Sequence, residues 1–278
     1  MLDTYIIKLV KLDILPAVTH IINLSISSKE YPVAWKRSKV IPLHKKEDLL
    51  NPKNYRPVAI IPILSKVMER VVFNQMVAFI TENKLIHPNH HAYRANHNTI
   101  TALLQMYDGW LDSLEKGEMA GVCFLDMSAA FDIVDHKLLI KKLELYGFDA
   151  GMLSWVLSYL SERQQCVSID GCLSRLQHVH HGVPQGSILG PLLYILFTNE
   201  LPEVVHHECQ AGPPSATWPN YTMSCETCGS IGCYADDTTY TCSGPDSLVL
   251  SEMLTSKFKL IADFLVSNKL KLNVTRLI

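Results

Sequence analysis

Two adjacent carboxylates, Asp236 and Asp237, are the residues of this sequence best placed to do chemistry. An apolar run, Ile231–Ala235, precedes them, and a run of strand-favouring residues, Thr238–Cys242, follows them. Two short strands joined by a tight acidic turn are therefore predicted. Neighbouring carboxylates repel each other and lose hydration, so the pair favours a bound cation such as Mg²⁺ or Mn²⁺. Taken alone, however, an Asp-Asp pair in a turn is most often only a solvated turn.

A third carboxylate, Asp126, follows a near-continuous apolar run far upstream. The run Gly121–Leu125 is typical of a strand that is buried on both faces and delivers a charge at its end. The alternative is that Asp126 only caps the turn that follows. Three carboxylates at two strand ends would form a two-metal site, in which ions about 4 Å apart hold the attacking and leaving oxygens of a phosphoryl transfer.

Three motifs follow one another along the chain in an order that resembles the palm of reverse transcriptases. They are Phe124–Asp132 (FLDMSAAFD), Gly182–Pro191 (GVPQGSILGP) and Tyr234–Asp237 (YADD). Two further segments, Asn54–Val58 (NYRPV) and His91–Arg94 (HAYR), resemble the finger motifs of the polymerase of non-LTR (LINE-type) retrotransposons. Together the similar segments extend over most of the chain, from about Leu24 to Asn273.

The resemblance implies a fold and an activity. The fold is an α/β (α+β) right-hand polymerase with fingers and palm, and the activity is that of an RNA-directed DNA polymerase (reverse transcriptase) of a retrotransposon. Such an enzyme transfers deoxynucleoside triphosphates to the 3′-hydroxyl of a DNA primer on an RNA template. In this chain Asp126, Asp236 and Asp237 would hold the two Mg²⁺ (or Mn²⁺) ions.

The resemblance also implies which residues bind the nucleotide. The arginine that matches Arg56 grips the triphosphate, as a guanidinium can through two hydrogen bonds, and a nearby lysine helps it. The aromatic ring that matches Phe131 lies under the sugar and excludes a 2′-hydroxyl. Gln185 matches a residue that touches nucleotide and template, in a turn whose glycine allows close approach to a ligand. The candidate nucleotide-binding residues are Arg56, Lys45, Lys46, Phe131, Gln185 and Gly186, with the two lysines left as alternatives.

Local patterns predict the elements that would position these residues. Leu103, Tyr107, Leu111 and Leu114 recur at helical spacing, which is typical of a helix that packs on a core through one face. A strand running into a basic loop is predicted over Val40–Lys46, and a returning strand over Tyr55–Ile61. Helices are predicted over Pro16–Ser28, Ser65–Lys84, Thr99–Lys116, Lys137–Tyr146, Ser187–Asn199 and Ser247–Ser267.

The chain is expected to have three parts. Residues 1–35 form an N-terminal helical extension, residues 36–117 the fingers, and residues 118–278 the palm, with a Cys-rich insertion at about 203–232. The segment Leu270–Arg276 resembles the family's next motif, with Arg276 where a lysine is usual. Because the sequence ends at Ile278, we expect the thumb to be absent.

Four cysteines lie near one another in the sequence, within the insertion or directly after it: Cys209, Cys225, Cys228 and Cys233. Cys225 and Cys228 have the two-residue gap of a zinc knuckle. A single pair of this kind is a weak signal, because structural zinc sites usually combine two. A structural Zn²⁺ site and a long loop with reduced cysteines stay open as alternatives.

Charge and hydropathy limit the class of protein. The net charge of −2 is unusual for a protein that holds nucleic acid, since neutralised phosphates supply much of the affinity. Basic residues nevertheless outnumber acidic ones in the first 60 positions, either as a nucleic-acid contact or as a solvated face. No apolar run reaches the length of a membrane helix, and no secretion signal is visible. We therefore expect an intracellular protein, in the nucleus or cytoplasm, without a membrane partner, and leave its oligomeric state open.

Two other functions fit the same sequence. The chain could be a catalytically inactive retroelement remnant that keeps its metal ligands. It could also be an RNA-binding module that uses the basic N-terminal hairpin and the Cys-rich insertion. Metal-dependent nucleotide incorporation separates the enzyme from both alternatives.

Overall fold

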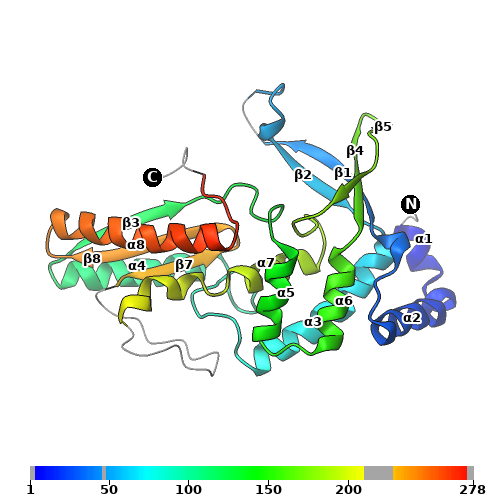
Figure 1. Ribbon diagram of the computed structural model, residues 1–278, viewed down its shortest axis with the longest axis horizontal. Helices are drawn as coiled ribbons and strands as arrows, with labels where there is room; N and C mark the ends of the chain where they lie inside the picture. Colours follow the sequence, from blue (N-terminus) through cyan, green and yellow to red (C-terminus); the bar gives the residue numbers. More distant parts are fainter. Residues whose placement is uncertain (1–3, 46–47, 210–227, 274–278) are drawn as a thin grey trace.

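The computed structural model describes residues 4–45, 48–209 and 228–273, and these form an elongated molecule with a β-sheet towards each end (Figure 1). A three-stranded sheet occupies one end. A five-stranded sheet lies towards the other, and helices fill the space between them (Figure 1). The mixed α/β architecture predicted from the sequence is therefore confirmed.

The three-stranded sheet carries the acidic hairpin. Its strands are β3 (Met119–Leu125), β7 (Ser230–Tyr234) and β8 (Asp237–Gly244), in the order β3-β8-β7 with antiparallel pairing throughout. The predicted hairpin is thus confirmed. The expectation that Gly121–Leu125 is buried on both faces is wrong, since Leu125 is buried but Phe124 is 48% exposed.

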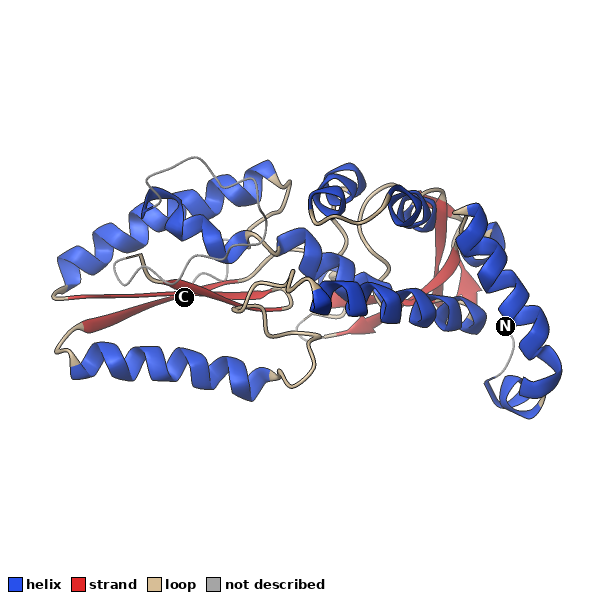
Figure 2. Ribbon diagram, turned by 90° about the horizontal axis from the view of Figure 1, so that it is seen from below, coloured by secondary structure: helices blue, strands red, loops and turns tan. Residues whose placement is uncertain are grey.

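Helices cover both faces of this sheet (Figure 2). On one face Gly121 lies against Leu250 of α8 (Ser247–Ser267), as the apolar stripe of that helix predicts. On the other face Gly232 approaches Met106 of α4 (Thr99–Glu115). In α4 the only buried residue is Ala102, so the predicted core stripe is wrong. Its large apolar side chains are exposed, namely Leu103, Tyr107, Leu111 and Leu114.

The five-stranded sheet joins segments from two distant parts of the chain. Strands β1 (Arg37–His44) and β2 (Tyr55–Ile60) form an antiparallel hairpin with the short helix η2 (Pro52–Asn54) in its connection. Strand β4 (Arg163–Ile169) pairs with β1 in parallel. The strands β5 (Cys172–Leu173) and β6 (Gln177–Val179) then pair antiparallel with β4. Residues 163–179 thus follow β3 in sequence but complete the sheet of the fingers.

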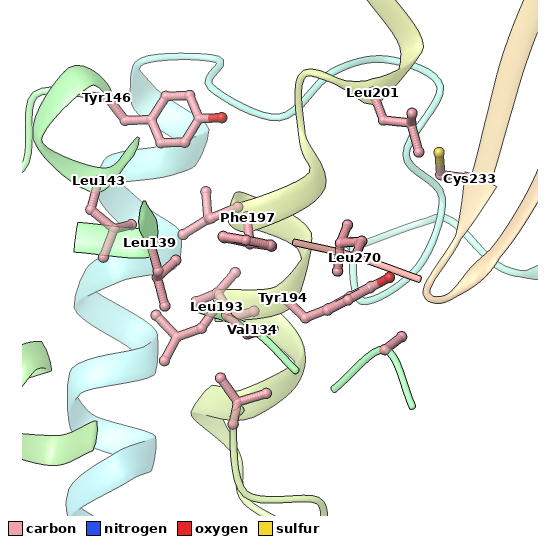
Figure 3. Packing of buried hydrophobic residues seen from close by; sticks show 14 of the residues in the cluster. Val134, Leu139, Leu143, Tyr146, Leu193, Tyr194, Phe197, Leu201, Cys233 and Leu270 are labelled. Atoms are coloured by element: carbon pink, nitrogen blue, oxygen red, sulfur yellow. The ribbon is translucent and has the colours of Figure 1, made fainter. Parts of the chain in front are cut away.

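The hydrophobic core lies between the two sheets. It is built around α7 (Leu189–Thr198), in which all but one residue are buried, as its apolar sequence predicts. Figure 3 shows Leu193 and Phe197 of α7 beside Leu139 and Leu143 of α5 (His136–Leu145). The helices α3 (Ile63–Glu82) and α6 (Ala150–Leu160) complete this layer, and η3 (Leu201–Cys209) follows α7.

Two helices precede the fingers, α1 (Thr4–Leu9) and α2 (Lys11–Ser28), followed by the short helix η1 (Val33–Trp35). Only Ile22 and Ser25 of α2 are buried, and the indole N–H of Trp155 donates to Ser25 Oγ at 3.0 Å. Helix α2 thus contacts the core through Ile22 and Ser25, and Tyr31, which follows it, is fully buried there. In the described part of the chain, no helix is both long and apolar enough to span a membrane.

Candidate active site

The three predicted metal-binding carboxylates lie at one end of the three-stranded sheet. Asp236 is in the two-residue turn of the β7–β8 hairpin, and Asp237 is the first residue of β8. On the adjacent strand Leu125 pairs with Thr238, so Asp126 comes one rung further on, at the level of Asp237. Partial burial, and then the charges of Asp236 and Asp126, raise the pKa of Asp237. The structure therefore brings the three acids together.

The turn that holds Asp236 contains a strained residue. Ala235 has a φ of +57°, in the left-handed region that side chains other than glycine seldom adopt. Two-residue hairpin turns require such a positive φ, and glycine usually supplies it. Hairpin geometry therefore imposes this conformation on an alanine directly beside two carboxylates.

Asp126 is fixed by a segment from the other end of the chain. Asn273 donates from Nδ2 to Asp126 Oδ2 at 2.9 Å, and its backbone N–H donates to the Asp126 carbonyl at 2.8 Å. Nearby, the N–H of Ser128 donates to the Lys271 carbonyl, and Met127 forms a bridge with Leu272. The segment that follows α8 thus orients the Asp126 carboxylate. The segment was predicted from its resemblance to the family's next motif, but the contact of Asn273 with Asp126 was not. Arg276 lies outside the described residues.

Gln185 is held by an acid that sequence analysis did not select. Its Nε2 lies 2.9 Å from both carboxylate oxygens of Asp132, to which it donates. Its carbonyl accepts from the N–H of Ala59 in β2 at 2.8 Å. Asp132 ends the FLDMSAAFD motif, six residues after Asp126, and this position is the signal that could have identified it. The motif that carries Gln185 is therefore tied both to the fingers and to the motif that carries Asp126.

Two glycines allow these close approaches. A Cβ atom on Gly182, with φ at +83°, would lie 2.5 Å from the Asp132 carbonyl oxygen. A Cβ atom on Gly186, with φ at +103°, would lie 2.7 Å from the carbonyl oxygen of Ala59. Glycine is needed at both positions because of backbone conformation and contact with neighbouring backbone. The observed approach of Gly186 is to strand β2, and the predicted contact with nucleotide stays a prediction.

Phe131 packs on Tyr194, an aromatic residue of the core. It is half-buried, and its ring lies 4.6 Å from that of Tyr194, with an angle of 32° between the planes. Tyr194 extends from α7 and is fully buried (Figure 3). Burial, followed by the charge of Asp236, raises the pKa of the Tyr194 hydroxyl. Phe131 is therefore backed by the core while part of the residue stays exposed, and its role beneath the sugar stays a prediction.

The cationic candidates lie on the finger hairpin. Arg56 is exposed and pairs with Leu43, and Lys45, also exposed, follows β1. The charge of Lys45 acts to lower the pKa of Asp132, while burial raises it overall. Arg56 acts on the hydroxyl of Tyr93, whose pKa burial and Asp236 raise. Arg56 therefore acts on the same tyrosine as Asp236, whereas Lys45 acts on the acid that holds Gln185. Lys46 lies outside the described residues.

The carboxylates offer hard oxygen ligands of the kind that Mg²⁺ and Mn²⁺ prefer. Burial raises the pKa of Asp237, and the charges of Asp236 and Asp126 add to this effect; a bound cation would relieve the repulsion among the three acids. Within residues 4–45, 48–209 and 228–273, no three His, Cys, Asp or Glu side chains are already arranged as a metal site. The donor types thus fit divalent cations, and the side chains would have to converge around them.

The predicted zinc ligands fall only partly within the described chain. Cys225 lies outside it, and the side chain of Cys209 is likewise not described. Cys228 and Cys233 are both buried. Burial raises the pKa of the Cys233 thiol to about 12, which disfavours the thiolate that zinc binds. The zinc site stays a prediction.

A cavity of about 800 Å³ opens beside the carboxylates. It lies between α4 and the sheet, and its wall includes Asp126 and Asp237 at one end and Phe124 and Met106 along its length. Phe124, which is 48% exposed, is part of the strand that lines it. The acids thus border a space that is large enough for a nucleotide-sized group.

Comparison with known proteins identifies the family. Residues 43–276 match the family described as "Reverse transcriptase (RNA-dependent DNA polymerase)". The RNA-directed DNA polymerase from mobile element jockey of Drosophila melanogaster is 34% identical over 203 residues, which cover 73% of this chain and 22% of that protein. The probable RNA-directed DNA polymerase from transposon X-element of the same species is 33% identical over 188 residues, covering 67% of this chain and 20% of that protein.

Solved structures agree on the fold. Apo telomerase from Candida tropicalis, truncated from its C-terminal domain, superimposes with a TM-score of 0.55 at 12% identity, covering 88% of this chain and 50% of that one. This likeness shows a right-hand polymerase fold. The chain spans about a fifth of the length of the curated relatives named above. It belongs to the reverse transcriptase family, within the branch of non-LTR retrotransposons.

Proposed function

We propose that this chain is the nucleotidyl-transfer core of an RNA-directed DNA polymerase. The primer 3′-hydroxyl oxygen attacks the α-phosphorus of a deoxynucleoside triphosphate in line with the leaving group. A phosphodiester bond forms, the bond from the α-phosphorus to the bridging oxygen breaks, and pyrophosphate leaves. The primer is extended by one nucleotide, and the hydroxyl proton passes to solvent.

The observation that carries this proposal is the register of β3 and β8. Because Leu125 pairs with Thr238, Asp126 and Asp237 come level at the sheet end, with Asp236 in the adjoining turn. These three side chains would hold two divalent cations. When bound, such ions increase the acidity of the 3′-hydroxyl and neutralise charge on the phosphates. Asn273 keeps the Asp126 carboxylate oriented for this role.

The nucleotide would lie between the fingers and the carboxylates. Arg56 and one of the neighbouring lysines, Lys45 or Lys46, would bind the triphosphate. Arg56 supports this because its charge acts on Tyr93, the same tyrosine on which the charge of Asp236 acts. Phe131, braced by Tyr194, would exclude a 2′-hydroxyl and so favour deoxynucleotides. Gln185 and Gly186 would contact nucleotide and template from the loop that precedes α7.

The relatives support RNA as the template, since those with 32–34% identity are named RNA-directed DNA polymerases. An RNA template, a DNA primer and deoxynucleoside triphosphates are therefore the partners we propose. An intracellular site of action, in nucleus or cytoplasm, follows from this use of nucleic acid.

Primer extension on an annealed RNA template, with Mg²⁺ or Mn²⁺ and deoxynucleotides, tests the proposal. Asp236→Asn removes one charge from the acid cluster and should abolish incorporation while the thermal unfolding transition is kept. Asp170→Asn is a matched control, because Asp170 is exposed and lies in the β4–β5 turn far along the chain from the acids. Extension that persists in Asp236→Asn would refute the metal mechanism. A folded wild-type chain that extends no primer would favour an inactive remnant or an RNA-binding module.

A further inference from the structure

A buried carboxylate outside the acid cluster has an unusual set of partners. Glu69 lies in α3, and its side chain is fully buried. One oxygen accepts the backbone N–H groups of Ile188 at 2.8 Å and of Leu189 at 3.3 Å. The other oxygen accepts the hydroxyl of Ser65 at 3.1 Å. A carboxylate from the finger side of the molecule thus holds the first turn of α7, 119 residues further along the chain.

The first turn of α7 depends on this contact. Helix N-termini leave backbone N–H groups without partners inside the helix, and buried ones need an acceptor. Ile188, at the N-cap, supplies no side-chain acceptor. Ser187 Oγ accepts from the N–H of Gly190 at 2.9 Å and donates to the Pro184 carbonyl at 2.7 Å. Glu69 therefore supplies the acceptor for Ile188 and Leu189, and the helix dipole favours its negative charge there.

A relay of hydroxyl groups orients the Glu69 carboxylate. Ser65 donates to Glu69, so in the 2.6 Å contact between Tyr31 and Ser65 the Tyr31 hydroxyl must be the donor. The guanidinium of Arg163 lies over the rings of Tyr159, at 5.0 Å, and Tyr31, at 5.9 Å. Its positive charge acts on Glu69 against the effect of burial, which raises the pKa of the carboxyl. Glu69 is therefore held in one orientation by groups from several elements.

Packing alone does not account for a carboxylate at this place. Burying a charge is expensive, and an apolar side chain of similar volume often serves stability as well or better. What an apolar side chain lacks is the acceptor oxygen that the start of α7 uses. The loop immediately before that start carries Gln185, which is bound to Ala59 in β2 and to Asp132, six residues after Asp126 in the chain.

We propose that Glu69 is a positioning residue for the nucleotide site: by fixing the first turn of α7, it fixes the loop that presents Gln185 and Gly186. The inference rests on the proposed function, because the loop is taken to contact the incoming nucleotide. Glu69 itself touches no substrate. Its loss should therefore weaken the binding of deoxynucleotide more than it slows the chemical step.

Glu69→Leu and Glu69→Gln separate the acceptor from the volume of the side chain. Leucine fills the space without an acceptor, whereas glutamine can accept from Ile188 through Oε1 and donate to Ser65 Oγ through Nε2. In Glu69→Leu, hydrogen exchange at the amides of Ile188 and Leu189 should become at least about tenfold faster. Glu69→Gln should keep both amides protected. Glu82→Leu, at the exposed end of the same helix, is the matched control.

Primer-extension kinetics complete the test. In Glu69→Leu the KM for deoxynucleotide should rise by about tenfold with little change in kcat, and Glu69→Gln should restore it. Unchanged exchange in a folded Glu69→Leu protein, or faster exchange without a change in KM, would overturn the inference. If Glu69→Leu does not fold, Glu69→Asp, which is too short to reach Ile188, should give the same result. If the wild-type chain extends no primer, the proposed function fails, and the exchange measurement alone decides whether Glu69 holds α7.

Discussion

The hydrogen bond from Asn273 to Asp126 gives a prediction whose size follows from its geometry. Asn273→Ala removes the 2.9 Å bond to Oδ2 but leaves the backbone bond between the same residues. A hydrogen bond to a charged group contributes about 1.5–3 kcal/mol. Because Asp126 and Asn273 are only half-buried, we take the lower end of this range. A change of about 1.4 kcal/mol is tenfold in rate, so kcat for primer extension should fall about tenfold.

The assay is single-turnover primer extension at a series of Mg²⁺ concentrations. Asn273→Asp should be slower than Asn273→Ala, because it sets a second carboxylate against Asp126. Asn83→Ala is the matched control, since it removes a similar 2.8 Å bond from an exposed asparagine, to the carbonyl of Phe79. Rates for Asn273→Ala within twofold of the wild type would show that the side chain of Asn273 does not orient Asp126.

Two further predictions concern stability. Ala235→Gly should leave the free energy of unfolding in urea equal or slightly higher, because relief of about 1 kcal/mol of left-handed strain exceeds the entropic cost of glycine. Ala235→Val should lower the free energy of unfolding by about 1–2 kcal/mol. A valine variant as stable as the wild type would show that the backbone at residue 235 is not strained. Burial acts to raise the pKa of Asp135, but the Lys269 ammonium at 2.6 Å and the N–H of Leu138 outweigh it and lower that pKa. The ionised form is thus favoured on folding, so wild type should exceed Asp135→Asn in stability above about pH 5 and lose that margin as pH falls below about 4. A margin independent of pH would refute the role of this pair.

Local patterns in the sequence were sufficient to predict several helices and strands. The acidic turn between two strand-like runs predicted the β7–β8 hairpin, and the apolar periodicity of Ser247–Ser267 predicted α8 and the face that it buries. The position of Asp126 after a strand was also correct. In each case the information lies within a few residues, because turn chemistry and side-chain period act locally.

Contacts between distant residues were not predictable in this way. The pairing of β1 with β4, the bond from Asn273 to Asp126 and the bond from Ile188 to Glu69 join positions more than one hundred residues apart. Nothing in the local pattern of Glu69 separates it from an exposed helical glutamate. For helix α4 the local pattern was misleading. Its apolar stripe predicts a buried face, but those side chains are exposed, and the helix approaches the sheet through Met106.

The parallel pairing of β1 with β4 has a consequence for how the protein is made. During synthesis the β1–β2 hairpin leaves the ribosome first, followed by β3, and only later by β4 and β6. The sheet that begins at Arg37 is therefore completed only when Val179 has emerged. Until then one edge of β1 exposes backbone groups that could pair with another chain. Because such non-local pairing is slow, the nascent β1–β2 hairpin has to wait for residues 163–179 before its sheet is complete.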